Sequence, residues 1–172
     1  PLADVISCFC IPLRRRVRHP GRQRKAEDAP VKAESLSGCC LMVRRKALEE
    51  AGLFDERFWM YGEDHDLCAR AAGCGWGVWY LPSVQIVHHG DRSGSQQPLL
   101  MRREHLRSHY LYHKKHSGLG AAVLYRIAVC AAGLTFLMVF ARKRRAFLWH
   151  LTAVLWALTD WSGTRRGDRQ EE

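Results

Sequence analysis

The sequence predicts an α/β domain followed by an apolar helical tail. Strand-like and helix-like patterns alternate over about 50 residues in the first half, the order expected of an α/β layer. Further on, residues 118–141 are 24 positions with a single charged side chain, Arg126, as in a helix surrounded by apolar groups. A chain of 172 residues is long enough for one domain with such an appendage, and too short for two full-sized domains.

The first expected strand and helix are neighbours in the sequence. Residues 39–43 form an apolar run after a glycine, which is typical of a buried strand. Residues 45–51 have the pattern of a short helix, and Gly52 suits its C-terminal cap. We expect Leu53 and Phe54 to pack back on this helix.

A second helix and two more strands are expected after an aromatic loop. Residues 62–73 begin with acidic side chains, which the N-terminus of a helix favours, and their apolar residues share one face. That face consists of Leu67, Cys68, Ala71 and Ala72. The runs 76–81 and 84–87 have the composition of short strands, and we expect Trp76 to pack beneath the site.

The last third of the sequence has the patterns of three helices. Residues 99–116 are polar, and residues 146–161 are apolar and follow four cations at 142–145. The segment 118–141 is long enough to span a membrane if Arg126 snorkels. The second apolar segment is too short to span, and its tryptophans suit a membrane interface. The alternative is a helical hairpin packed on the core of the domain itself.

The basic charge is local, which argues against a nucleic-acid-binding protein. The 27 Lys and Arg residues and 17 Asp and Glu residues give a net charge of +10, but seven cations lie within residues 14–25. No recognition helix or zinc-finger pattern accompanies them. Seven cysteines without a Cys-x-x-Cys pair indicate a reducing compartment, and Cys39, Cys40 and Cys68 are expected to fill core positions.

Three carboxylates crowd the start of the second expected helix. Glu63, Asp64 and Asp66 repel one another unless the helix dipole, a metal or a substrate hydroxyl engages them. An acidic cap that merely starts the helix is the alternative. Trp59 and Tyr61 directly before it favour a binding site, because aromatic rings hold the apolar face of a sugar while a carboxylate accepts a hydroxyl proton.

Five ordered blocks, which cover residues 37–116 with the polar helix after them, carry a resemblance to a known family. The blocks are Ser37-Gly38-Cys39-Cys40-Leu41-Met42-Val43-Arg44-Arg45, Gly52-Leu53-Phe54-Asp55-Glu56-Arg57-Phe58, Tyr61-Gly62-Glu63-Asp64-x-Asp66-Leu67-Cys68-x-Arg70, Gly75-Trp76 and Val87-His88-His89-Gly90. Together they closely resemble the C-terminal half of bacterial family 2 glycosyltransferases of the rhamnosyltransferase type.

The resemblance implies the acceptor-side half of a Rossmann-like GT-A fold with a membrane-associated helical tail. In such enzymes the second acid of a Glu-Asp pair activates the acceptor hydroxyl for an inverting displacement. That places the general base on Asp64, with Glu63 helping to hold the acceptor. Trp59, Tyr61 and Asp66 are expected to shape the acceptor pocket.

The resemblance also implies a divalent metal, Mg²⁺ or Mn²⁺, bound with the nucleotide-sugar donor. A histidine about two dozen residues after the acidic pair joins the metal shell in relatives, and His88 follows Asp64 by 88 − 64 = 24 positions. His89 is the alternative if the register shifts by one. The Asp-x-Asp motif of the donor half is absent, since Asp64-His65-Asp66 has that spelling but lies in the acceptor helix.

Histidines on the polar helix offer another possible metal site. His105, His109 and His113 recur every four residues. Because cations are interleaved with them, we expect a solvated or phosphate-facing surface. Tyr110, Tyr112 and Lys115 could then meet a lipid-diphosphate acceptor or lipid headgroups.

The expected function is transfer of rhamnose or a similar hexose to a cell-surface polysaccharide or lipid-linked glycan, at the cytoplasmic face of the bacterial inner membrane. Since the first Met is Met42, we expect a fragment that lacks most of the donor site and has little activity alone. A non-catalytic membrane-associated remnant or interaction module is the alternative.

The expected segments are a basic linker and remnant of the N-terminal half (1–36), the acceptor half (37–98), a basic helix (99–117), the apolar membrane-associated helices (118–161) and a polar tail (162–172).

Overall fold

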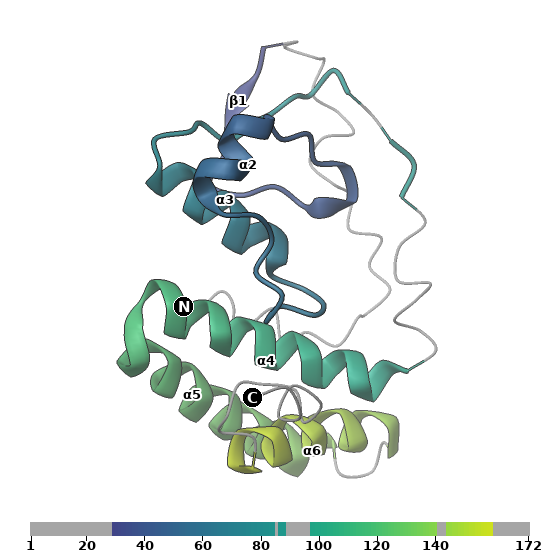
Figure 1. Cartoon of the computed structure of the whole chain (residues 1–172). Helices are drawn as coiled ribbons and strands as arrows, with labels where there is room; N and C mark the ends of the chain where they lie inside the picture. The colour runs from purple at the N-terminus through teal and green to yellow at the C-terminus, as the bar shows by residue number, and fades with distance from the viewer. Residues whose placement is uncertain (1–28, 85, 89–96, 141–143, 160–172) are drawn as a thin grey trace. The chain divides into compact units, whose positions relative to one another are not determined.

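The computed structural model describes residues 29–84, 86–88, 97–140 and 144–159. The elements are β1 (Val31–Lys32), the 3₁₀ helix η2 (Gly38–Cys40), α2 (Arg45–Ala51), α3 (Glu63–Gly73), β2 (Trp79–Tyr80), α4 (Pro98–His116), α5 (Gly118–Phe140) and α6 (Arg144–Thr159) (Figure 1). They belong to two compact units. The α2–α3 unit comprises the described residues of 12–56 and 63–91, and the helical unit comprises 57–62 and those of 92–172.

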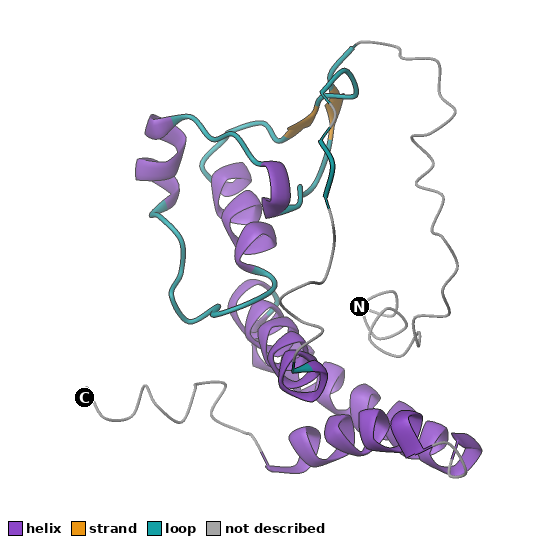
Figure 2. Cartoon of the chain, turned by 90° about the vertical axis from the view of Figure 1, so that its right-hand side faces the viewer, coloured by secondary structure: helices purple, strands orange, loops and turns teal. Residues whose placement is uncertain are grey.

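The described part of the chain is mainly helical, with one sheet of two short strands (Figure 2). β1 pairs antiparallel with β2, with Val31 opposite Tyr80 and Lys32 opposite Trp79. Part of the expected strand 76–81 is therefore confirmed. Its partner comes from residues 1–36, for which the sequence predicted a basic linker and a remnant of the N-terminal half.

The predictions of two strands, at 39–43 and 84–87, are wrong. Residues 38–40 form η2 instead, capped by the hydroxyl of Ser37, and residues 84, 86 and 87 have no regular structure and are exposed. Cys39 and Cys40 are likewise exposed rather than in the core, whereas Cys68 is buried as predicted. A short apolar run has no helical or extended preference strong enough to act alone, and a strand also needs a partner for its backbone groups.

The short helix α2 has the predicted boundaries. Gly52 adopts a left-handed conformation with φ +74°, and its N–H bonds to the carbonyl of Leu48, which ends the helix. The prediction that Leu53 and Phe54 pack back on α2 is wrong, since both are at least half exposed.

A small apolar core joins α2 and α3. Leu67, Cys68 and Ala71 of α3 are buried, while Ala72 is exposed. The core cluster is Ala51, Leu67 and Ala71, with Leu41, Val43, Leu48 and Trp76 packed against it. Trp76 packs against this core and also donates from Nε1 to Glu50 at 2.8 Å.

The helical unit has the larger core. Pro98 occupies the first turn of α4, and Gly118, with φ +86°, begins α5 directly after α4 ends. The core is formed by Leu106, Tyr110, Ala122, Tyr125, Val129, Ala153, Trp156 and Ala157, from all three helices. The prediction that the charged residues of α4 are solvated is wrong for Arg102, Arg107 and His113, which are buried.

The helices α5 and α6 pack closely against each other. A Cβ atom at Gly133 would lie 2.7 Å from Cγ2 of Val154, so only glycine fits at this approach. Arg126 does not snorkel as the spanning prediction required. It is buried, and its Nε and Nη2 atoms donate to the carbonyls of Ala157 and Trp156, each at 2.8 Å. Both apolar helices thus contribute to a core that they share with α4.

Candidate functional site

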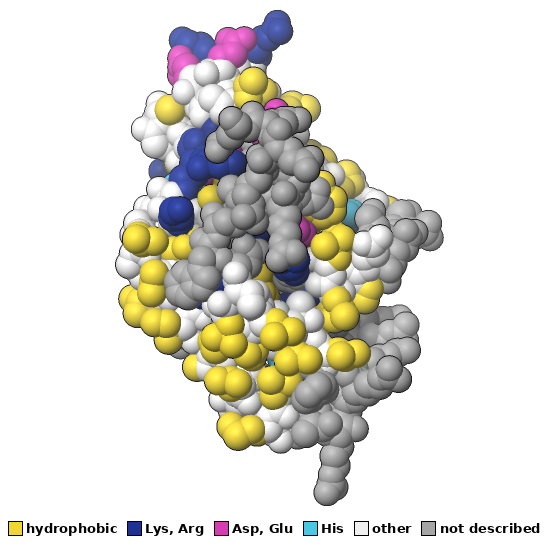
Figure 3. Space-filling view, turned by 60° about the horizontal axis from the view of Figure 1, so that its bottom comes forward, with side chains coloured by type: hydrophobic (Ala, Val, Ile, Leu, Met, Phe, Trp, Pro, Cys, Tyr) yellow, Lys and Arg dark blue, Asp and Glu magenta, His cyan; other side chains and the backbone are white. Residues whose placement is uncertain are grey.

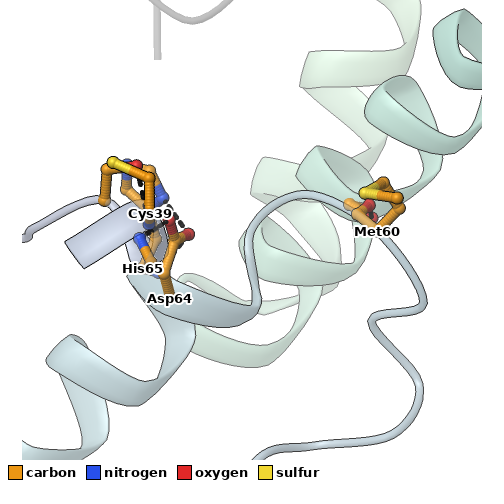
Figure 4. Close-up of polar contacts among 7 residues, drawn as sticks. Cys39, Met60, Asp64 and His65 are labelled. Carbon is orange, nitrogen blue, oxygen red and sulfur yellow. Dashed lines mark hydrogen bonds and ion pairs between the residues drawn. The ribbon is translucent and has the colours of Figure 1, made fainter. Parts of the chain in front are cut away.

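Asp64 lies in the first turn of α3, and its carboxylate connects this turn to η2 (Figure 4). Oδ2 accepts a hydrogen bond from the backbone N–H of Gly38 at 2.8 Å. Oδ1 accepts from the backbone N–H of His65 and lies 2.8 Å from Nδ1 of the same residue. The side chain is 14% exposed. Asp64 is thus held in place by groups from two segments that lie 26 residues apart.

These surroundings make Asp64 a strong acid. Burial raises the pKa of its carboxyl group, but the hydrogen bonds from His65 and Gly38 and the charge of His65 together lower it to about 2. The group is therefore a carboxylate at any physiological pH. Because a carboxylate oxygen can accept two hydrogen bonds, Oδ2 retains capacity for a substrate hydroxyl.

Glu63 precedes Asp64 at the start of α3. Among the residues that the structure describes, its Oε2 atom has no hydrogen-bond partner although the atom is buried. A buried carboxylate oxygen without a partner is costly, and a ligand hydroxyl would remove that cost. The geometry is compatible with the predicted role of Glu63 in holding an acceptor.

Asp66 lies on a different side of the helix. Its side chain is fully buried, and its Oδ2 accepts from Nε of Arg70 at 2.8 Å. The guanidinium group of Arg70 also donates to the carbonyls of Ala51, the last residue of α2, and of Gly52 and Leu53, which follow it. This arrangement favours a structural role for Asp66, in joining α3 to the end of α2, over the predicted acceptor contact.

The aromatic loop 57–62 belongs to the helical unit, where α4 supports it. The hydroxyl of Ser108 donates to the carbonyl of Met60 at 2.8 Å, and Lys115 lies 5.8 Å from the ring centre of Phe58. Tyr61 makes an edge contact with His105, with ring centres 5.3 Å apart, and has a left-handed φ of +68°. Trp59 is exposed and can meet a ligand.

The described residues do not form a metal centre by themselves. His88 is exposed and lies outside any helix or strand, and His89 is outside the described residues. No group of three or more His, Cys, Asp or Glu side chains in the described ranges could hold a metal ion. The rings of His105, His109 and His113 make aromatic contacts instead. His105 lies 4.5 Å from His109, and Tyr125 lies 6.0 Å from His109 and 5.2 Å from His113, between ring centres.

Sequence reasoning missed four supporting residues. Gly38 binds Asp64, Arg70 binds Asp66, and Ser108 and His105 contact the aromatic loop. The spacing of four between Asp66 and Arg70 is a detectable signal for a helical ion pair. Nothing in the sequence indicates the contact between Ser108 and Met60, which are 48 residues apart.

Comparison with known proteins gives one kind of match. The chain is similar to a rhamnosyltransferase. It is 37% identical over 127 residues to N-acetylglucosaminyl-diphospho-decaprenol L-rhamnosyltransferase of Mycobacterium tuberculosis, in strains CDC 1551 / Oshkosh and H37Rv. The match covers 73% of this chain and 41% of each curated relative, so the chain spans less than half of their length. No family model matches the chain, and no solved structure gives a significant match.

Proposed function

We propose that this chain carries the acceptor side of a glycosyltransferase that transfers rhamnose, or a similar hexose, from a nucleotide sugar to a lipid-linked glycan. The observation that carries the proposal is the 37% identity to a rhamnosyltransferase, combined with the fixed carboxylate of Asp64 beside Glu63. A GT-A fold of family 2 is part of the proposal. A lipid-linked acceptor would bring the protein to a membrane, and we place the reaction at the cytoplasmic face of the bacterial inner membrane.

In the proposed reaction, Asp64 is the general base. The acceptor hydroxyl attacks the anomeric carbon of the donor sugar, the bond from that carbon to the nucleoside diphosphate breaks, and the hydroxyl proton passes to Asp64. The configuration at the anomeric carbon inverts. Glu63 would accept a hydrogen bond from the acceptor through Oε2, and Trp59 and Tyr61 would contact the apolar face of the sugar.

The low pKa of Asp64 places a condition on this mechanism. A carboxylate with a pKa of about 2 is ionised but accepts a proton weakly. Acceptor binding that replaces one of the hydrogen bonds from Gly38 or His65 would raise the pKa of Asp64 and strengthen it as a base. Such an exchange is local, because His65 is 55% exposed and can turn away from Asp64.

A divalent cation with His88 in its shell belongs to the proposal as an expectation. Such an ion would stabilise the departing diphosphate when bound. Among the described residues His88 is the candidate ligand, and it is exposed.

A second candidate is an interaction module without transfer activity. The bonds of Asp64 to Gly38 and to the N–H of His65 favour it, since an acidic side chain that starts a helix and fixes a neighbouring turn has a sufficient structural role. In that case the same residues would bind a glycan without proton transfer.

The test compares transfer by Asp64→Asn with that by Glu49→Gln, an exposed acid on α2. The assay is release of nucleoside diphosphate from a nucleotide-activated rhamnose with a diphosphoprenol-linked N-acetylglucosamine acceptor, for this chain and for a form extended by the donor half. We expect activity only in the extended form. There Asp64→Asn should lower transfer about 10²–10⁴-fold with donor binding unchanged, the range typical of a lost general base.

Two results would overturn parts of the proposal. Near-normal transfer by Asp64→Asn would remove Asp64 from the role of base. No transfer by any form with common donors would favour the interaction module.

A further inference from the structure

The helix α5 has one exposed apolar face and one buried face. Large apolar side chains at five positions are exposed, from 48% at Leu134 to 77% at Met138. These positions are Leu119, Leu124, Ile127, Leu134 and Met138. At 100° per residue Leu124, Ile127, Leu134 and Met138 lie on one side of the helix, opposite the buried residues Ala122, Tyr125, Arg126 and Val129, while Leu119 lies in the first turn of α5, outside this face.

The exposed apolar surface continues on α6. Leu148, Leu155 and Leu158 are exposed, while Ala153, Val154 and Trp156 are buried. Viewed from the side of α5 and α6, hydrophobic side chains gather over this part of the unit (Figure 3). Large apolar side chains that gather on one exposed face mark an interaction site. We call it the α5–α6 face.

The buried side of α5 cannot face lipid. It packs against α4 and α6, and α4 buries Arg102, Glu104 and Arg107. Arg126, near the middle of α5, is bound to carbonyls of α6 and lies 4.7 Å from the ring centre of Trp156. A crossing of the bilayer by α5 would carry these charged groups of α4 into the hydrocarbon region, which is strongly unfavourable.

Cations stand at both ends of α5 in the sequence. Lys114 and Lys115 precede it, and Arg142, Lys143, Arg144 and Arg145 follow its last residue. Basic residues beside an apolar helix remain on the negatively charged side of a membrane. A helix that spans the bilayer would separate these two clusters, whereas a helix that lies in the surface keeps both on one side.

We infer that the α5–α6 face binds an anionic lipid surface, with α5 and α6 lying in the plane of the interface rather than crossing the bilayer. By length and composition Gly118–Met138 could span a membrane. The buried charges and the cations at both ends are the reasons for the in-plane arrangement. The inference deepens the membrane association in the proposed function and rests on it, but lipid binding is measured without sugar transfer, so each can fail separately.

The first experiment is flotation of the 172-residue chain with vesicles of pure phosphatidylcholine or of phosphatidylcholine with 30% phosphatidylglycerol. We expect at least tenfold stronger binding to the anionic vesicles and weaker binding at high salt. The double variant L124E/I127E should lose at least tenfold of this binding. The control V87E changes an 82% exposed valine of the α2–α3 unit and should bind normally.

The second experiment measures how deeply residues of α5 lie in the bilayer. A fluorescent amino acid is placed at Gly120, Ile127 or Met138, which share one face of α5, and quenching by lipids that carry nitroxides at two depths is compared. An in-plane helix places all three at the same shallow depth. A deeper position for Ile127 than for the two ends would indicate a spanning helix and overturn the arrangement.

Two other outcomes would contradict the inference that the α5–α6 face binds lipid. One is absence of vesicle binding by the wild-type chain. Another is a dimer that L124E/I127E converts to a monomer, with no vesicle binding, since that would show a second copy on the face. Circular dichroism of each variant establishes that the helices remain folded, and the milder variant L124Q gives a second measurement if they do not.

Discussion

The two units of the chain differ in the sign of their buried charges and in the groups that neutralise or bind them. In the α2–α3 unit, buried charge is anionic at Asp66, and it is matched by the guanidinium group of Arg70. In the helical unit, buried charge is mainly cationic, and Arg126 is held by backbone carbonyls and aromatic rings. The first unit has a small apolar core and depends on specific polar bonds, whereas the second has a larger core. Loss of one polar group should therefore affect the first unit more.

The largest effect is expected from Arg70→Met. Removal of the guanidinium leaves the buried carboxylate of Asp66 without its partner and the carbonyls at the end of α2 without donors. Breaking a buried ion pair in this way costs about 3–5 kcal/mol, enough to unfold a unit with a small core. Hydrogen exchange of peptides from α2 and α3 should show the loss of protection, with peptides from α4 as an internal reference.

Arg45→Met is the matched control for Arg70, because Arg45 is 92% exposed and its ion pair in the described part of the chain is with Glu49 on the same helix. We expect a change below about 0.5 kcal/mol for this surface pair. Equal protection in Arg70→Met and Arg45→Met would contradict the idea that one polar group holds the α2–α3 unit together.

A smaller effect is expected from Arg126→Met in the helical unit. Methionine keeps the apolar contacts with the rings of Tyr110 and Trp156 but leaves the carbonyls of Trp156 and Ala157 without a donor. The expected loss is about 1–3 kcal/mol, with faster hydrogen exchange near the end of α6. The exposed residue Arg103 gives the control Arg103→Met. A loss as large as that of Arg70→Met would remove the contrast between the units.

A comparison at Gly38 tests the electrostatics of Asp64. Gly38→Ala keeps the N–H that Asp64 accepts, and the added Cβ would lie at an ordinary 3.5 Å from Asp64. Gly38→Pro removes the N–H, while Ser37 already has the extended ψ of 137° that a following proline requires. We expect a higher pKa of Asp64 in the proline variant, measured by NMR titration, and little change in the alanine variant. A rise in both would show that the backbone itself had moved.

The hydrogen bonds of Asp64 also make stability depend on pH. The pKa is lowered in the folded chain from 3.8 to about 2, so the contribution is complete above the unfolded value and is lost as pH falls toward 2. The amount is about 1–2 kcal/mol by linkage. Urea unfolding between pH 2 and pH 5 should show this slope, and Asp64→Asn should remove it.

The smallest effect is expected at His150 of α6. Burial, and then the charge of Arg102, lower the pKa of His150 below 6.5. The unfolded chain therefore binds a proton more readily than the folded one near that pH. The contribution of neutral His150 to the stability of the helical unit should be complete above pH 6.5 and decrease on acidification, as measured by urea unfolding. His150→Phe should flatten this dependence, and an unchanged slope would exclude His150 as its source.

Local patterns in the sequence were sufficient for most helices and for the position of Asp64. The acids at the start of α3, Gly52 after α2 and the apolar periodicity of α5 depend on residues within a few positions of each other. The likeness to a rhamnosyltransferase could also be recognised from ordered motifs. Such signals survive without tertiary contacts because helix caps, dipoles and periodicity are local.

The partners of each charge were decided only by the tertiary structure. The sequence did not show that Asp66 turns inward to Arg70, that Gly38 binds Asp64, or that Arg126 binds carbonyls of α6 rather than snorkelling. It also predicted strands at 39–43 and 84–87 that do not form in the described residues. The sequence alone located the α-helices to within two residues and showed which residues carry charge. Which group each charge meets depends on segments distant in the chain, because burial and hydrogen bonding are properties of the packed structure.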